Sequence, residues 1–483
     1  MKTIARNVGD FAGGMNRREF IGSAAAMFAA GCAGGFPDLA GARMKMGVLS
    51  DVHLHAEGDE DTLLKAFAYF RDHGADAVLI AGDIANTGKV VQLQRCADAW
   101  YKVFPNDRAP DGRHVEKLFI YGNHDVWGGY WGNGNKFRED SIYYNDRYAK
   151  VWEDVFHEPY SDFWLKNVRG IPVIGGHWTK KDQFDGLADF LKRHAKEIDP
   201  ARPMIYTQHS HPLNTCMGPW AWGRDNGAST RALSAYPNAV AFSGHSHYTL
   251  VDERSVWQGA FTSINTASLR YASFDYSLRE NVGWNGHGYL GEKNARKHRM
   301  AEYGSKSNTD GRQGMLVSVW DDRLVIERRD FCQDASLGPD WVVPLPASES
   351  APFAFKVHER RRTAPEFAKG AEVSVKTTPP ADGKDFTHVN VTFPAAKPVD
   401  GCRVNEYEVT AILCEDEVEL VQAQRRMLSP DYYKPETLLV DKVTFTFAAE
   451  DLPLKGHYRF EVRPIECFGH KGGKIESGIV EIA

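Results

Sequence analysis

The sequence of 483 residues contains few cysteines, no excess of positive charge and no long apolar run. The seven cysteines are scattered and none forms a C-x-x-C pair, so a thiolate zinc site or a dithiol redox motif has little support. An odd number excludes complete internal pairing, although a disulfide from Cys402 or Cys414 to Cys467 stays open. The net charge of −6 argues against a general nucleic-acid binder, because such proteins need a basic face.

The remaining composition is that of an ordinary soluble globular protein, with 42% hydrophobic and 25% charged residues. The length is sufficient for about two or three domains, each with its own core. One basic cluster, Arg360, Arg361 and Arg362, falls within a predicted linker, where we expect a solvated turn.

The N-terminus has the features of an export signal. Arg17 and Arg18 precede a short, Ala-rich apolar run over residues 20–31, a pattern that resembles a twin-arginine signal. The run is shorter than the roughly 20 residues that a permanent membrane span needs. We therefore expect an exported protein, in the periplasm or at the cell surface, with residues 1–43 serving as signal and linker.

The same segment contains a candidate lipid attachment site. The sequence Ala29-Ala30-Gly31-Cys32 resembles a lipobox, which implies a lipid anchor on Cys32 after cleavage. Ala29 stands where leucine is preferred, so an exported protein without a lipid is the alternative.

Short apolar runs alternate with helical patterns in the next 300 residues or so. Continuous apolar runs between helices indicate strands covered on both faces, and hence an α/β fold. A segment over 126–167, rich in Trp, Tyr and Gly, has no clear strand pattern and is expected near the mouth of a site. The expected strands include 44–50, 77–81, 118–121, 171–174, 204–206, 239–242 and 315–320, and the expected helices are 61–73, 90–104 and 184–198.

The character of the chain changes near Pro344. Residues 347–370 are rich in Pro, Ser and Arg and are predicted to be a linker. Residues 371–483 contain alternating strand patterns without helices, which predicts a small all-β sandwich. Leu452-Pro453 followed by Tyr458 resembles the end of a fibronectin type III domain, in which the tyrosine closes a corner.

Five polar clusters each follow an expected strand. Because strand ends in open α/β sheets face a common crevice, residues far apart in sequence are expected to meet there. The clusters supply carboxylate, amide and imidazole donors, a set suited to Mn, Fe, Zn or similar divalent ions. They are Asp51-Val52-His53, Gly82-Asp83, Gly122-Asn123-His124-Asp125, Gln208-His209 and Gly244-His245-Ser246-His247.

These loops, in this order, resemble those of the calcineurin-like metallophosphoesterase family over about residues 44–346. The resemblance implies a four-layer α/β/β/α sandwich with two divalent metal ions. One ion would be held by Asp51, His53 and His247 and the other by Asn123, His209 and His245, with Asp83 bridging both.

The chemistry of these donors agrees with the resemblance. A bridge needs a carboxylate with two anionic oxygens, which Asp83 provides. Two divalent ions balanced only by Asp51 and Asp83 leave the site near a formal +2, which favours an anionic phosphate ester. Metal ions about 3.5–4 Å apart can share a hydroxide for in-line attack on phosphorus. We therefore expect hydrolysis of phosphomonoesters or phosphodiesters of small molecules, lipids or nucleotides.

The resemblance also assigns roles to two residues that are not metal ligands. His124 would stabilise the transition state and protonate the leaving oxygen, and Asp125 would orient its ring. The alternative for His124 is a structural imidazole behind the ligands.

The fourth loop departs from the family pattern. In the family this loop, which here begins at Gln208, usually reads His-x-Pro. This chain has two histidines, His209 and His211, before Pro212. We favour His209 as the ligand because it directly follows the strand, with His211 as the alternative. His55 and His177 are expected at the surface or behind the ligands.

Purple acid phosphatases, a branch of the same family, carry a tyrosine three residues after the bridging aspartate. Asn86 occupies that position here, so a charge-transfer ferric site is not expected. Several aromatic residues could form a wall that stacks on a base, sugar or lipid, although a loop folded over its own small core is the alternative. They are Trp127, Tyr130, Trp131, Tyr143, Tyr144, Trp220 and Trp222.

Two other functions stay open beside phosphate-ester hydrolysis. One is hydrolysis of a nucleotide or pyrophosphate at the same metals. The other is a catalytically inactive binding protein that uses the β-sandwich to hold a partner. The intact Asp51, Asp83, Asn123 and His124 argue against an inactive protein.

Overall fold

The computed structural model describes residues 41–181, 184–217, 223–273, 308–378, 388–415, 418–447 and 451–482. The predicted export signal with Arg17, Arg18 and Cys32 lies outside these ranges, as do Trp220 and Trp222. Within them, no helix has the length and apolar character needed to cross a membrane.

The first sheet is mixed and contains the N-terminal strand near its centre. Its order is β12-β11-β10-β1-β2-β3, with β13 also paired to β11. β1 pairs in parallel with β2 and antiparallel with β10, which comes more than 260 residues later. The strands are β1 (Met44–Leu49), β2 (Ala77–Ile80), β3 (Glu116–Phe119), β10 (Gln313–Val319), β11 (Arg323–Asp330), β12 (Ala335–Ser336) and β13 (Trp341–Pro344).

The second sheet has the order β4-β5-β6-β7-β9-β8. Its four inner strands are parallel, and the edge strands β4 and β8 are antiparallel to their neighbours. The strands are β4 (Phe163–Val168), β5 (Ile171–Gly176), β6 (Met204–Thr207), β7 (Ala239–Ser243), β8 (Val256–Gln258) and β9 (Thr262–Asn265).

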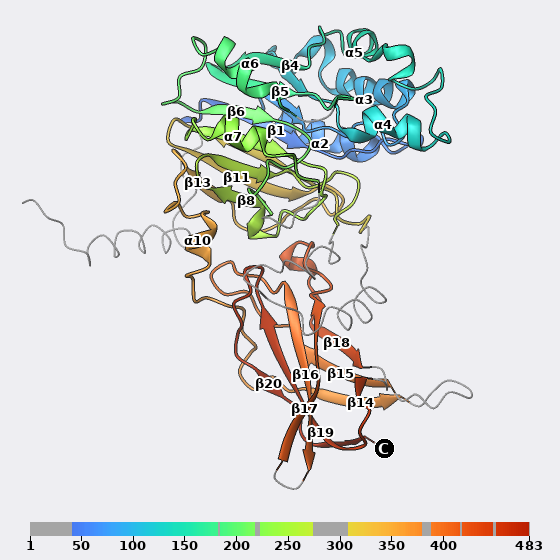
Figure 1. The fold of residues 1–483 in the computed structure, drawn as a ribbon, viewed down its shortest axis with the longest axis vertical. Coiled ribbons are helices and arrows are strands. Elements are labelled where there is room, and N and C mark those ends of the chain that lie inside the picture. The colour runs from blue at the N-terminus through green and yellow to red at the C-terminus, as the bar shows by residue number, and fades with distance from the viewer. Residues whose placement is uncertain are drawn as a thin grey trace, which may run out of the picture. The chain divides into compact units, whose positions relative to one another are not determined.

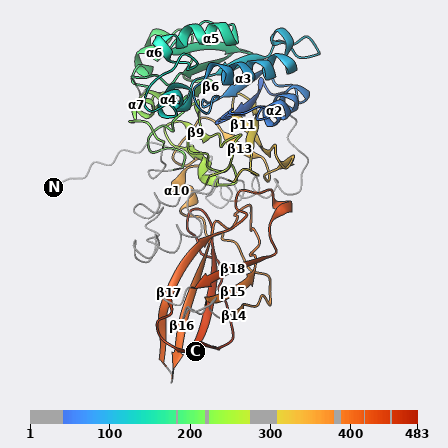
Figure 2. The same cartoon turned by 90° about the vertical axis from the view of Figure 1, so that its right-hand side faces the viewer.

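Helices cover the outer face of each sheet (Figure 1; Figure 2). The described helices of this domain are α2 (Asp61–Asp72), α3 (Val90–Val103), α4 (Asn123–Trp131), α5 (Tyr148–Phe156), α6 (Leu187–Arg193) and α7 (Ala228–Leu233). Short 3-10 helices lie at Pro105–Asp107, Tyr144–Asp146 and Glu253–Ser255.

The alternation of buried side chains along the strands produces three apolar layers. In β2, Ile80 packs with Phe67 of α2, whereas Leu79 points the other way and packs with Ile205 of the second sheet. On the far side of the second sheet, Tyr206 packs with Leu187 of α6. Successive residues of a strand point to opposite faces, so both sheets are covered on both sides. The predicted four-layer α/β/β/α fold is confirmed.

The C-terminal part contains two antiparallel sheets, in the orders β14-β15-β18 and β17-β16-β19-β20, with β21 paired to β19. Val389, Val391 and Phe393 of β15 are buried and alternate with less buried residues, as expected for a sheet with one covered face. The predicted all-β region is confirmed. Its strands are β14 (Ser374–Thr378), β15 (His388–Pro394), β16 (Glu406–Glu415), β17 (Val418–Leu428), β18 (Lys442–Phe447), β19 (Gly456–Ile465), β20 (Ile475–Glu476) and β21 (Val480–Ile482), with a 3-10 helix at Glu436–Leu438.

Some local predictions were wrong. The segment over 126–167 contains α5 and β4, because Trp152 and Phe156 give α5 a buried apolar face. The predicted linker contains a short helix, α10 (Phe355–His358), with Phe355 buried. Arg361 is not a solvated turn residue, since its guanidinium donates to both carboxylate oxygens of Glu253, at 3.0 and 2.7 Å. The six described cysteines are all free thiols.

Candidate metal centre

Loops from both sheets meet at the carboxyl ends of their parallel strands. The loop after β1 positions Asp51 and His53, the loop after β2 positions Asp83, and Asn123 begins α4 after β3. The second sheet contributes His209 after β6, and His245 and His247 after β7. The predicted residues from the five clusters therefore converge on one place.

Many of these residues have an unusual backbone. Five of them, Asp51, His53, Asp83, His245 and His247, have φ angles between 48° and 71°. Such left-handed conformations are uncommon for residues other than glycine and concentrate at functional sites. The turns after the strands aim these side chains inward at the cost of local backbone strain.

The first group contains Asp51, His53 and His247, whose donor atoms all lie within 4.8 Å of one another. Oδ1 of Asp51 lies 2.9 Å from Nε2 of His247 and 3.7 Å from Nε2 of His53. The two imidazole Nε2 atoms are 3.2 Å apart. This group is the same set that the resemblance assigns to one metal ion.

The second group contains Asp83, His209 and His245, again within 4.8 Å of one another. Nε2 of His209 lies 3.1 Å from Nδ1 of His245 and 3.1 Å from Oδ2 of Asp83. The same Oδ2 lies 3.7 Å from Nε2 of His53, which belongs to the first group. Asp83 thus stands between the two groups, in the position predicted for the bridging carboxylate.

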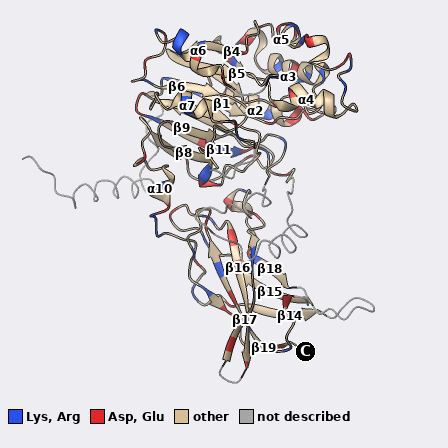
Figure 3. Ribbon diagram, viewed as in Figure 1, with Lys and Arg blue, Asp and Glu red and all other residues tan. Residues whose placement is uncertain are grey.

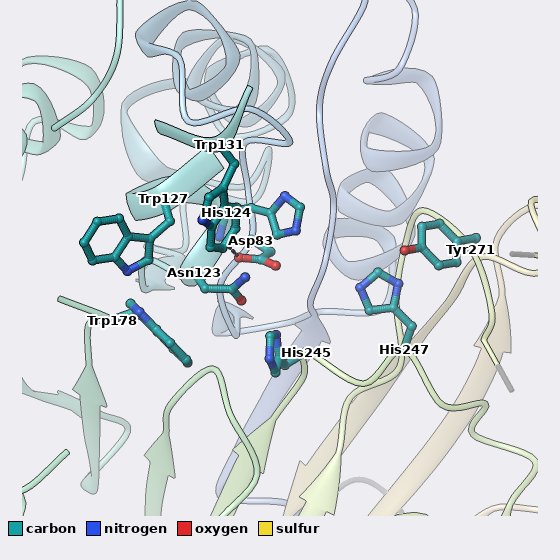
Figure 4. A pocket seen from close by; sticks show the side chains of 9 residues that line it. All are labelled: Asp83, Asn123, His124, Trp127, Trp131, Trp178, His245, His247 and Tyr271. Carbon is teal, nitrogen blue, oxygen red and sulfur yellow. Dashed lines mark hydrogen bonds between the residues drawn. The ribbon is translucent and has the colours of Figure 1, made fainter. Parts of the chain in front are cut away.

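Asn123 lines the pocket beside these groups (Figure 4). The residue is 7% exposed, and its Oδ1 accepts no hydrogen bond from any described residue. A buried amide oxygen without a donor is costly in free energy unless another partner takes its place. Asn123 is therefore a further oxygen donor that points into the site.

The charges of the site are balanced only in part. Burial alone would raise the pKa of Asp51, but His247 and His209 hold it well below its usual value. Burial alone would lower the pKa of His209, but the nearby carboxylates of Asp83 and Asp51 have the larger effect and raise it to about 9. Two buried carboxylates thus create a strong preference for positive charge at this position.

Hydrogen bonds behind the donors fix which ring nitrogen faces the centre. Nδ1 of His209 donates to the carbonyl oxygen of Ala81 at 2.7 Å, which leaves Nε2 facing Asp83. Nδ1 of His53 lies 3.1 Å from Oδ1 of Asn86, which leaves its Nε2 facing Asp51 and Asp83. Such outer contacts are typical of imidazoles that bind metals.

His211, the alternative to His209, lies away from the centre. Its Nδ1 is 2.9 Å from Oγ of Ser243 and its Nε2 is 2.7 Å from Oγ of Ser246, so both ring nitrogens are hydrogen-bonded. Burial lowers the pKa of His211 to about 3, so the ring is neutral at ordinary pH. His211 thus stabilises the loop after β7, and His209 is the histidine that faces the centre.

His124 lies against the centre but is oriented differently from the prediction. Its Nδ1 is 2.7 Å from the backbone oxygen of Asn86, and its ring packs edge-on against His53 at 4.6 Å between centroids. Asp125 was expected to orient this ring, which was wrong. Its carboxylate accepts the backbone N–H groups of Ile84, Ala85 and Gly122 instead, at 3.2, 2.7 and 2.7 Å.

The role of Asp125 is thus to join the loops after β2 and β3. Burial and the neighbouring Asp83 raise its pKa to about 7. Because Asp125 sits at the third position of α4, it also satisfies a free N–H group at the start of the helix. The helix N-terminus that carries Asn123 and His124 is fixed in this way against the loop that carries Asp83.

An open pocket of about 480 Å³ lies over the centre (Figure 4). Of the aromatic residues predicted to form a wall, Trp127 and Trp131 line it. Tyr143 is buried and stacks on Tyr148, as in the alternative of a loop with its own core. Trp127 and Trp131 thus lie where the predicted wall requires, and Tyr143 belongs to the core of its own loop, while stacking on a ligand stays a prediction.

The two histidines outside the predicted clusters take supporting places. His177 is buried, and its Nδ1 accepts the N–H of Tyr121 at 3.0 Å. His55 is exposed and lies 3.5 Å from the amide nitrogen of Asn86.

Three residues near the centre were missed or given too little weight. Asn86 contacts both His53 and His124, yet in the sequence it was notable only as a position without tyrosine. Trp178 and Tyr271 line the pocket. Trp178 follows β5 by two residues, so the rule that strand ends face one crevice could have found it. Tyr271 lies six residues beyond β9 and gives no such signal.

The donor set fits divalent cations. It combines carboxylate and amide oxygens with imidazole nitrogens, it lacks thiolates, and its two acids are deeply buried. Imidazole nitrogens that face one another at 3.1–3.2 Å, beside an amide oxygen that accepts no hydrogen bond from a described residue, are the arrangement expected where a cation would be bound.

Comparison with known proteins identifies the domain. Residues 44–249 match the family model described as calcineurin-like phosphoesterase. No curated protein matches the sequence.

Solved structures also resemble this chain at low sequence identity. A dimetal phosphatase from Danio rerio has 11% identity and a TM-score of 0.35, covering 62% of this chain and 98% of that chain. GAP50, the anchor in the inner membrane complex of Plasmodium, has 12% identity and a TM-score of 0.37, covering 63% and 89%. Wild-type Vps29 complexed with zinc, from Entamoeba histolytica, has 10% identity and a TM-score of 0.29, covering 62% and 99%. The family match and the four-layer fold show that this chain contains a calcineurin-like metallophosphoesterase domain.

Proposed function

We propose that the protein is an exported, metal-dependent hydrolase of phosphomonoesters or phosphodiesters. The observation that carries this proposal is the position of Asp83, whose Oδ2 lies 3.1 Å from His209 of one donor group and 3.7 Å from His53 of the other. A carboxylate shared by two imidazole-rich groups is the arrangement that two adjacent cations require.

The proposed metal ligands are those that the sequence predicts. Asp51, His53 and His247 would hold one divalent cation, Asn123, His209 and His245 would hold the other, and Asp83 would be shared by both. When bound, such cations supply charge for an anionic phosphate and an activated water for attack on phosphorus. Mn, Fe and Zn all suit this mixture of oxygen and nitrogen donors.

The chain itself supplies the proton for the leaving group. We assign this role to His124, which lines the pocket and contacts none of the described acids through its ring nitrogens at hydrogen-bond distance. Because Nδ1 donates to the carbonyl of Asn86, the protonated ring presents Nε2–H to the pocket. Asp125 acts by holding the start of α4 in place.

Small phosphate esters are the proposed substrates, and a nucleic-acid backbone is not. Lys and Arg positions are interspersed with Asp and Glu along the described ribbon (Figure 3), and the net charge is −6. Proteins that track nucleic-acid phosphates concentrate basic residues on one face. The alternatives are hydrolysis of nucleotides or pyrophosphate at the same site and a binding role without catalysis, and the assay below tests the last of these.

Export by the twin-arginine signal is a separate proposal, based on Arg17, Arg18 and the apolar run that follows. A lipid on Cys32 would keep the protein at the membrane surface. Because this route carries folded proteins, it suits an enzyme that binds its metals before leaving the cytoplasm.

We also propose that residues 371–483 form a fibronectin type III-like domain, after a catalytic domain over 44–346 and a connection over 347–370. Two antiparallel sheets and the hydroxyl of Tyr458, which donates to the carbonyl of Leu454, support this assignment. A tyrosine that bonds back a few residues upstream is a known corner of β-sandwich domains.

The test is hydrolysis of 4-nitrophenyl phosphate and bis(4-nitrophenyl) phosphate with added Mn²⁺. We expect the full chain to hydrolyse at least one of them and Asn123→Ala to lose that hydrolysis. Asn167→Ala is the matched control, because Asn167 accepts the N–H of Gly170 on an exposed turn outside the centre. No hydrolysis by a metal-loaded wild type, or full activity of Asn123→Ala, would contradict the proposal.

A further inference from the structure

One face of α4 carries both the proposed proton donor and two indole rings. His124, Trp127 and Trp131 are three and seven residues apart, which places them on the same side of a helix. All three line the pocket (Figure 4). The ring of Trp131 meets that of His124 edge-on, with 5.7 Å between centroids.

Trp131 is unusually open for so large an apolar side chain. It is 52% exposed, whereas Trp100 and Trp152 in the same domain are buried. Exposure of about half of an indole ring to water is unfavourable in free energy, and a ligand stacked on the ring would bury that apolar surface.

Neighbouring aromatic side chains pack against Trp127. Its ring lies 6.1 Å from Phe137 and 5.9 Å from Tyr130, and Lys180 lies over the ring of Phe137 at 4.7 Å. A ring supported in this way gives a flat ligand a surface that needs little reordering on binding.

The rest of the pocket is aromatic or belongs to the metal centre. Trp178 lies 5.8 Å from the ring of His245, and Tyr271 lies 4.4 Å from that of His247. Among the described residues that line the pocket there is neither Lys nor Arg. Charge beyond one phosphate group would therefore find no Lys or Arg among these lining residues to neutralise it.

From this arrangement we infer that the substrate is a monophosphate ester whose leaving alcohol carries a planar aromatic ring, and that Trp131 and Trp127 receive this ring. The inference rests on the proposed function. Water adds to phosphorus, the bond from phosphorus to the alcohol oxygen breaks, and His124 gives its proton to that oxygen. The aromatic alcohol leaves beside α4 because the residue that protonates it stands on that helix. Nucleosides and phenols share this chemistry.

The experiment compares phenyl phosphate, thymidine 5′-phosphate and n-butyl phosphate, or their methyl esters if diesters are preferred. We expect Trp131→Ala to lower kcat/KM for the two aromatic esters by about 5- to 100-fold, the range that base stacking supplies, with n-butyl phosphate changed less than about 3-fold. Tyr144→Ala is the matched control, since Tyr144 lies in the same segment, contacts Arg147 and does not line the pocket.

The results distinguish between the two kinds of alcohol that could carry the aromatic ring. A loss confined to thymidine 5′-phosphate would identify a nucleoside, and a loss confined to phenyl phosphate would identify an aryl alcohol. An equal loss on n-butyl phosphate, or no loss on any ester, would overturn the inference. Unchanged melting of Trp131→Ala checks that the variant is folded.

A second measurement does not depend on turnover. Thymidine 5′-phosphate should quench the tryptophan fluorescence of the metal-loaded protein, and Trp131→Ala should require at least about 5-fold more ligand for the same quenching. If the wild type hydrolyses neither these three esters nor the 4-nitrophenyl esters, the proposed function fails, while this binding result still decides on the aromatic contact. Quenching that is identical in both proteins would contradict the inference.

Discussion

Asn86 contacts two imidazole rings through different atoms. Its side-chain Oδ1 lies 3.1 Å from Nδ1 of His53, and its backbone oxygen lies 2.7 Å from Nδ1 of His124. A substitution removes the first contact and keeps the second. The two rings can therefore be perturbed separately.

We expect Asn86→Ala to weaken Mn²⁺ binding or lower activity by about 10- to 100-fold, the usual effect of removing a partner that orients a metal-binding imidazole. Asn86→Asp keeps an acceptor oxygen and should lose less. Metal affinity is measured by titration of the metal-free protein. Equal affinities for the wild type and Asn86→Ala would show that this contact does not position His53.

Replacement of His124 should affect esters according to their leaving groups. Loss of a proton donor costs about 10²- to 10⁴-fold in rate when the leaving oxygen needs a proton. We therefore expect His124→Ala to lose most of its kcat on an alkyl phosphate and much less on 4-nitrophenyl phosphate, whose anion leaves without a proton.

The bound metal, measured by elemental analysis, should be unchanged in His124→Ala because His124 is not among the proposed ligands. The same loss on both kinds of ester would assign His124 a structural role instead.

The loop between β3 and α4 has no room for a side chain at its last residue, Gly122. A Cβ on Gly122 would lie 2.2 Å from Oδ1 and 2.4 Å from the backbone nitrogen of Asp83. The start of α4 can approach the loop after β2 this closely only with glycine at this position.

We expect Gly122→Ala to destabilise the fold by about 1–3 kcal/mol, as overpacking does, and to displace Asp83. Thermal melting and Mn²⁺ titration measure the two effects. Gly473→Ala is the control, because a Cβ there would meet nothing within 4 Å and its φ is not positive. Normal metal binding by Gly122→Ala would show that the loop adjusts without moving the carboxylate.

The elements that the sequence predicted best are those with a local signal. The apolar run of β2 and the helical spacing of α2 agree with the observed bounds to within one residue. The helix expected over 184–198 is shorter, since α6 spans Leu187–Arg193. In α5 the many aromatic residues concealed an amphipathic helix, because Trp and Tyr occur in helices, strands and loops alike.

The candidate centre was predictable to the extent that its residues follow strands directly. Asp125 was assigned to His124 because the two are adjacent in sequence, yet its partners Ile84 and Ala85 lie 41 and 40 residues away. Likewise, only the fold shows that both nitrogens of His211 are bound to serines. Contacts of this kind depend on how the two sheets pack, which no local pattern encodes.

At the scale of the molecule, the donors come from two separate sheets. Asp51, Asp83 and Asn123 follow strands of the first sheet, and His209 and His245 follow strands of the second. A cation held by both sets joins the two sheets to each other. Metal binding and stability of this domain are therefore linked.

We expect Mn²⁺ at about 100 times its dissociation constant to stabilise the fold by about 2.7 kcal/mol relative to the chelated protein. Differential scanning calorimetry with Mn²⁺ and with a chelator measures the difference. Asp83→Asn, which removes one of the two buried charges, should show a smaller gain. Identical melting of the wild type in both conditions would mean that the centre does not bind this ion.

The pairing of β1 with β10 also has a consequence for the order in which the protein is made. Every proposed ligand has been synthesised by residue 247, but β10, which flanks β1 on one side, is completed only at Val319. A growing chain therefore contains all the donors before the strand that positions Asp51 is held from both sides. We therefore expect stable metal uptake only after β10 has been synthesised and can pair with β1. A chain whose translation stops between residues 247 and 319 would contain every proposed ligand but would lack the complete strand that flanks β1.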